Sequence, residues 1–120
     1  MPAKACTNGE LNKIDLMLVT NDEMLRLPTE RVLRAENFDV VSVNSRDNAL
    51  FMLNRYCPSV IIVENGAISP RDIENIRMKY PAVRILITGE DSDYKDLEDI
   101  YFIPKPLNYA KLINKIKLIL

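Results

Sequence analysis

Short apolar runs along the chain alternate with longer segments in which apolar positions recur at helical spacing. The runs are rich in β-branched and aliphatic residues and predict strands at 14–19, 38–43, 60–63, 83–88 and 101–103. The longer segments predict helices at 23–36, 45–56, 69–80 and 108–120. This alternation predicts an α/β fold, with a five-stranded parallel sheet and helices on both of its faces.

Local signals set several of these boundaries. Ser69 and Pro70 have the residue types of an N-cap followed by the first helical position, and Ser45 is of the same N-cap type. Pro28 interrupts the first helical segment, so that helix either kinks or starts near Pro28. Pro58 opens the third strand, whose continuous apolar run suits the buried centre of a parallel sheet.

The segment between the last two predicted strands differs from the other connections. Six of the twelve residues at 89–100 are acidic, and Leu97 and Ile100 are its only aliphatic residues. Such a segment has little apolar surface to bury against a sheet. A helix in this place is therefore expected to be short, loose or absent.

Length and composition limit the class of protein. The 120 residues suit one domain, which we place at 13–120 behind a flexible polar tail at 1–12. No apolar run reaches the roughly 20 residues of a membrane-spanning helix, and the start lacks the pattern of a signal peptide. The two cysteines, Cys6 and Cys57, are expected to be unpaired thiols, which favours a cytoplasmic protein.

Charge and residue types exclude several functions. Sixteen basic and seventeen acidic residues give a net charge of −1, whereas a nucleic-acid-binding domain is usually basic. The chain has no histidine, which excludes histidine metal sites, Ser-His-Asp catalysis and histidine phosphotransfer within it. We expect no direct nucleic-acid or membrane partner.

Polar residues follow the predicted strands, where the functional crevice of an open α/β sheet lies. They form four clusters, at 20–22, 64–66, 88–89 and 105–106. A nucleotide-binding enzyme of this architecture would need a phosphate-binding loop after the first strand. The segment 20–23 has no glycine and two acidic residues, so this function is disfavoured.

These four clusters resemble the receiver domain of two-component response regulators, and the resemblance covers about 13–120. Its most specific part is 102–106, which is similar to the family's fifth strand and the Lys-Pro pair, here Lys105 and Pro106. The segment 58–64 looks like the strand that ends in the phosphoacceptor aspartate. The segment 84–89 looks like the strand that ends in the switch residue.

The resemblance implies a flavodoxin-like fold and a role for each matching position. Glu64 occupies the phosphoacceptor position, and Thr20 and Asn21, with Asp22 adjacent, occupy the positions of the two metal-binding acids. The switch positions hold Thr88 and Phe102, and the resemblance implies a cis bond before Pro106.

Without the aspartate and the acid pair, the resemblance implies a degenerate receiver, or pseudo-receiver. We expect no enzyme activity, no cofactor and no bound metal, and a function through a protein partner, a fused output domain or a homodimer. The alternative is an atypical receiver that is still phosphorylated or responds to Mg²⁺. Glu64 is expected to pair with Lys105, either as a leftover structural ion pair or as a built-in mimic of the phosphorylated state.

Overall fold

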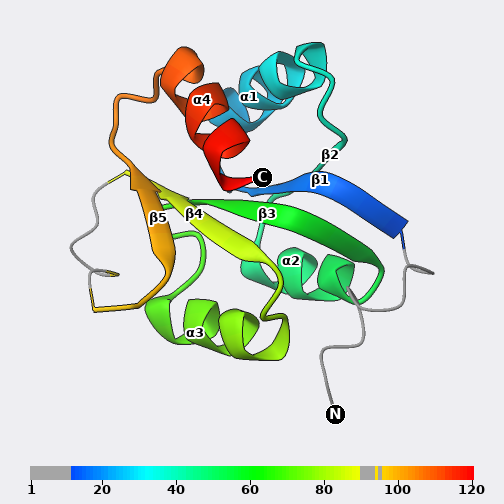
Figure 1. The fold of residues 1–120 in the computed structure, drawn as a ribbon, viewed down its shortest axis with the longest axis vertical. Coiled ribbons are helices and arrows are strands. Elements are labelled where there is room, and N and C mark those ends of the chain that lie inside the picture. Colours follow the sequence, from blue (N-terminus) through cyan, green and yellow to red (C-terminus); the bar gives the residue numbers. More distant parts are fainter. Residues whose placement is uncertain (1–11, 90–93, 95) are drawn as a thin grey trace.

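The apolar runs form one sheet in the computed structural model, which describes residues 12–89, 94 and 96–120 (Figure 1). Every strand pair is parallel, and the order is β2-β1-β3-β4-β5. The strands are β1 (Asn12–Val19), β2 (Val40–Val43), β3 (Tyr56–Glu64), β4 (Arg84–Thr88) and β5 (Ile100–Ile103). The predicted α/β fold with a five-stranded parallel sheet is confirmed.

Two helices lie on each face of the sheet (Figure 1). Leu16 and Leu18 of β1 pack against α1 and α4, whereas Met17 and Val19 pack in the cluster that contains α2 and α3. This follows from the alternation of side chains along a strand. The helices are α1 (Glu23–Ala35), α2 (Arg46–Leu53), α3 (Pro70–Lys79) and α4 (Tyr109–Ile119).

The first helix contains Pro28 rather than beginning there. It starts at Glu23, because Asp22 is its N-cap and accepts a hydrogen bond from the Met24 N–H over 3.0 Å. The helix continues past Pro28 to Ala35, with the buried Thr29 and Leu33 on its inner side. Of the two interpretations of the sequence, the late start at Pro28 is wrong.

The second helix ends, and the third strand begins, earlier in the sequence than predicted. The helix expected to reach residue 56 ends at Leu53, and β3 begins at Tyr56 rather than at residue 60. Pro58 lies inside β3 opposite Ile14 of β1. Strand β4 pairs with β3 only from Val60 onward, so the missing N–H of Pro58 costs no ladder bond on that side.

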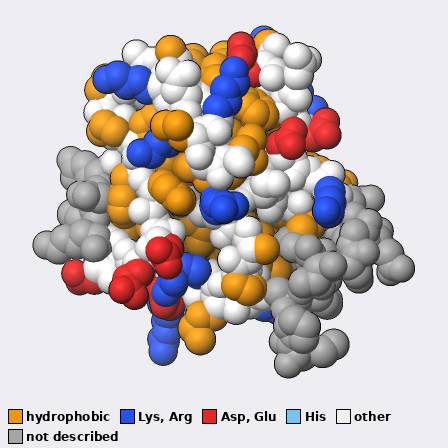
Figure 2. All heavy atoms as spheres, in the orientation of Figure 1, with side chains coloured by type: hydrophobic (Ala, Val, Ile, Leu, Met, Phe, Trp, Pro, Cys, Tyr) orange, Lys and Arg blue, Asp and Glu red, His pale blue; other side chains and the backbone are white. Residues whose placement is uncertain are grey.

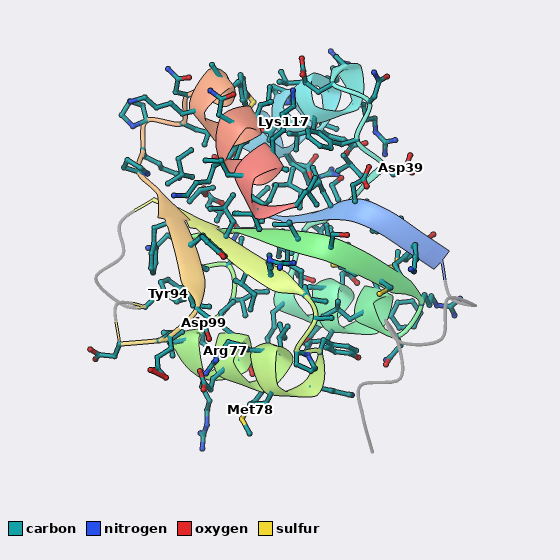
Figure 3. All side chains as sticks on the ribbon, viewed as in Figure 1. Asp39, Arg77, Met78, Tyr94, Asp99 and Lys117 are labelled. Carbon is teal, nitrogen blue, oxygen red and sulfur yellow. The ribbon has the colours of Figure 1, made fainter. Side chains whose placement is uncertain are left out.

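The connection between β4 and β5 differs from every other connection in the sheet. Among its described residues, 89, 94 and 96–99, there is no helix. Its last residues lie against α3, where the Asp99 carboxylate is 3.7 Å from the Arg77 guanidinium (Figure 3). Acidic side chains gather beside basic ones low on the face shown in Figure 2. The remaining residues of this acidic segment lie outside the described part.

The expectation of unpaired cysteines is wrong for Cys57, which is buried and disulfide-bonded. Its register partner is Lys13, so the beginning of β1 lies directly beside it. No local sequence pattern indicates this neighbourhood, because it depends on how the strands pair. Cys6 and the expected tail up to residue 11 lie outside the described residues, and β1 already begins at Asn12. No helix in the described part has the length and apolar character needed to cross a membrane.

Candidate functional site

Three polar side chains converge where β1, β3 and β5 end. Thr20 directly follows β1, Glu64 is the last residue of β3, and Lys105 lies two residues beyond β5. The parallel order of the strands brings these ends to one edge of the sheet. The sequence clusters around these three residues therefore form one site.

Glu64 is at the centre of the site and is bound on both carboxylate oxygens. The Lys105 ammonium donates to Oε2 over 2.8 Å, and the Thr20 hydroxyl donates to Oε1. The Glu64 side chain is only 13 % exposed, whereas that of Lys105 is 46 % exposed. A largely buried carboxylate of this kind is stable when its oxygens are paired.

The charge of Glu64 is favoured by its surroundings. Burial would raise the pKa of this carboxyl, but the hydrogen bonds from Lys105 and Thr20 and the charge of Lys105 together lower it. The net effect is a pKa below the ordinary glutamate value. Glu64 is therefore ionised at neutral pH, and it carries a negative charge at the end of β3.

The residues at and next to the positions expected for an acid pair differ in burial and in hydrogen bonding. Thr20 is fully buried, and its oxygen also accepts a hydrogen bond from the Asp22 N–H over 3.1 Å. Asn21 and Asp22 are exposed. Asp22 is the N-cap of α1, and its carboxylate accepts a hydrogen bond from the Met24 N–H. One of its oxygens is therefore bonded to the first turn of the helix.

Neither expected switch residue has a side-chain hydrogen bond to Glu64 in the described part of the chain. Thr88 is buried and is the register partner of Glu64 in the β3–β4 ladder. Phe102 is half-buried and packs in the cluster under α2 and α3. The peptide bond between Lys105 and Pro106 is cis, as the resemblance implied.

The donor set at this edge does not suit Mg²⁺. That ion prefers an octahedron of hard oxygen ligands, commonly with more than one carboxylate. Thr20 and Asn21, at the positions expected for an acid pair, have no carboxylate, and Glu64 is already bound by a lysine. Within residues 12–89, 94 and 96–120, no three His, Cys, Asp or Glu side chains cluster as a metal site.

Sequence reasoning missed Tyr94 as part of this region. Its ring is 1 % exposed, and its hydroxyl bridges the turn that follows Glu64. It donates to the Ile68 carbonyl over 2.6 Å and accepts from the Gly66 N–H over 3.0 Å. The one available signal was an aromatic residue in an otherwise acidic segment, which does not say what the ring packs against.

Comparison with known proteins identifies the fold. No protein-family model and no curated protein matches the chain. Among solved structures, it is similar to the chemotaxis response regulator CheY4 of Vibrio cholerae, with a TM-score of 0.77 and 19 % identity over 92 % of this chain and 99 % of that one. A CheY-like receiver domain protein from Methanospirillum hungatei has a TM-score of 0.78 and 17 % identity, covering 90 % and 92 % of the two chains.

A third similar structure is HP1043, an orphan response regulator of H. pylori. Its TM-score is 0.77 and its identity 14 %, over 88 % of this chain and 95 % of that one. Identities this low establish a likeness of fold. The chain therefore has the fold of a response-regulator receiver domain, and its function has to be argued from its own residues.

Proposed function

We propose that this chain is a pseudo-receiver, a non-catalytic signalling domain that acts by binding a protein without being phosphorylated on an aspartate. The observation that carries the proposal is the state of Glu64. It occupies the end of the central strand, and Lys105 and Thr20 bind its two oxygens. A carboxylate held in this way is a poor nucleophile for a phosphoryl group.

The geometry of the side chain adds to this argument. Glutamate extends its carboxylate one methylene further from the backbone than aspartate does. The neighbouring positions that would hold a metal carry Thr20 and Asn21, so little charge is available to neutralise phosphoryl oxygens. Asp22, which could supply one acid, caps α1.

The proposal is tested by a ¹⁵N–¹H NMR titration with Mg²⁺, followed by Mg²⁺ with beryllofluoride as a phosphoryl mimic. We expect the amides at 20–22, 64–66 and 88–89 to stay unmoved. Intact-mass analysis after incubation with a small phosphodonor should show no acyl phosphate. Saturable shifts or a phosphorylated species would instead identify an atypical receiver that is phosphorylated or responds to Mg²⁺.

A restored variant provides the matched control. Thr20→Asp, Asn21→Asp and Glu64→Asp together return the acids that a working site would use. If the remaining scaffold is intact, this variant should respond to Mg²⁺ and beryllofluoride while the natural sequence does not. A response of equal size in both proteins contradicts the pseudo-receiver.

The partner is a protein, either a separate chain, a fused output domain or a second copy. Fold and charge favour neither a nucleic acid nor a membrane surface as the direct ligand. Sedimentation of the purified chain over a range of concentrations tests the homodimer. We treat the Glu64–Lys105 pair as structural, so Glu64→Asp should leave self-association or partner binding unchanged; a loss of binding would show that Glu64 mimics a phosphorylated state.

The proposed cellular place is the cytoplasm, where two-component receivers work. The resemblance supports this location, whereas the disulfide at Cys57 does not, because disulfides are rare in cytosolic proteins. Fractionation of cells that express the natural chain tests it.

A further inference from the structure

We infer that Tyr94 is a positioning residue that couples the Glu64 site to the β4–β5 connection. The inference rests on Glu64 and the turn at 64–68, which three residues that follow β4 contact: two in the connection and one beyond β5. Each attachment is visible as a contact between described residues.

The first attachment is at the start of the connection. Gly89 has a φ of +112°, and a Cβ built on it would lie 3.0 Å from the Asn65 Cβ. The Asn65 N–H also donates to the Thr88 carbonyl over 2.8 Å. Only glycine allows the backbone to pass so close to the residue that follows Glu64 in this conformation.

The second attachment is the Tyr94 hydroxyl (Figure 3). It accepts from the Gly66 N–H and donates to the Ile68 carbonyl, so it is bonded to both sides of Ala67. The Ala67 N–H in turn donates to the Glu64 carbonyl over 2.9 Å, which closes the turn. A single phenol therefore fixes the backbone that begins at Glu64.

The third attachment lies beyond β5, two residues after that strand ends. Strand β5 follows it, and Lys105 beyond β5 binds the Glu64 carboxylate. The described residues Gly89, Tyr94 and Lys105 thus each contact Glu64 or the turn that follows it. Movement of the turn has to move either the Tyr94 hydroxyl or the Glu64 carboxylate, which links the two energetically.

The first arm of the test uses Tyr94→Phe, which keeps the ring and removes the hydroxyl. The titration of the Glu64 side-chain carboxyl is followed by ¹³C NMR. We expect Glu64 to titrate at higher pH in this variant, because Thr20 and Lys105 no longer meet it in fixed positions. In the described part of the chain, Lys105 is the charged side chain that lowers the pKa of this carboxyl.

Tyr80→Phe is the matched control for this arm. Tyr80 is also buried in the cluster under α2 and α3, but its hydroxyl bonds to Asn54, away from the turn. It should leave the Glu64 titration unchanged. If Tyr94→Phe leaves it equally unchanged, Tyr94 is a packing residue and the inference is wrong.

The second arm of the test changes Glu64 and follows the amides around Tyr94. Glu64→Ala should speed hydrogen exchange of the Gly66 and Leu97 amides by about three- to tenfold, the size expected for weakening one neutral hydrogen bond. The Leu97 N–H is a suitable probe because it donates to the Tyr94 carbonyl over 3.0 Å. The control is Glu30→Ala, which removes a different paired, part-buried carboxylate, one that lies on α1. It should not change the exchange rates of these amides.

Both arms have to respond, because coupling between two sites is reciprocal. A response in one arm alone overturns the inference. Neither arm contains Mg²⁺ or a phosphodonor, so the coupling can fail while the pseudo-receiver stands, and the reverse also holds.

Discussion

The two faces of the sheet are covered in different ways. On one face, α1 and α4 bury an aliphatic cluster in which Leu33, Leu112 and Ile116 are fully enclosed. On the other face, α2 and α3 cover part of the sheet, and Tyr94 from a connection without a described helix joins the same cluster. The first face is held by apolar burial, whereas part of the second depends on hydrogen bonds and backbone conformation.

This difference has a consequence for stability. Apolar burial of a leucine contributes in proportion to the area removed from water, and no single atom is decisive. A connection held at a few points loses its attachment when one of those points is lost. The two faces should therefore respond differently to substitution.

The largest effect is expected on the first face. Leu112→Ala should lower the free energy of unfolding by about 3 kcal/mol, because it removes a fully buried leucine and leaves a cavity. Urea denaturation measures the change. Leu118→Ala, at an 84 % exposed position on the same helix, should change it by less than about 0.5 kcal/mol. Equal losses in the two variants would contradict the assignment of the inner side of α4.

A smaller effect is expected where the second face depends on backbone conformation. Gly89→Ala should cost about 2 kcal/mol, because the residue has positive φ and its new Cβ would meet Asn65. Gly66→Ala is the matched control: its φ is +92°, but nothing lies within 4 Å of a Cβ there. The difference between the two unfolding free energies isolates the close contact. If Gly66→Ala costs as much as Gly89→Ala, the contact with Asn65 contributes nothing.

The sequence predicted the sheet and its four helices better than the connection between β4 and β5, for a physical reason. Strand runs, N-caps such as Ser45 and Ser69, and the aliphatic stripe of α4 are local patterns, and they placed the sheet and its helices. The polar ends of the strands could also be predicted to meet, because parallel strands end at one edge. The Tyr94 bridge and the disulfide at Cys57 join residues far apart in sequence, and no local pattern specifies such partners.

A pH effect tests the contact between Glu64 and Lys105. The pKa of Glu64 is lowered in the folded protein, so its contribution to stability is present above the ordinary glutamate value, about 4.3, and is lost as pH falls. Glu64→Gln should therefore lose less stability than the natural chain between pH 5 and 3, by no more than about 1 kcal/mol. Urea denaturation at several pH values measures this.

Removing the cation gives the matched comparison for that prediction. Lys105→Met should raise the pKa of Glu64 and weaken the acid dependence of stability, because the ammonium is one cause of the shift. Lys111→Met removes another lysine beyond β5, one with no ion pair in the described part of the chain. If stability depends on pH identically in the two methionine variants, the Glu64–Lys105 contact contributes nothing to stability.

The smallest effect is expected from the one ion pair in the described residues that joins the C-cap of α1 to α4. Lys117 and Glu36 lie 3.5 Å apart with side chains 59 % and 42 % exposed (Figure 3 labels Lys117). Lys117→Ala should change the unfolding free energy by less than about 0.5 kcal/mol, and high salt should remove the difference. A larger, salt-sensitive loss of unfolding free energy would mean that charge, as well as apolar burial, stabilises the first face. The two faces would then differ less in how they are held to the sheet.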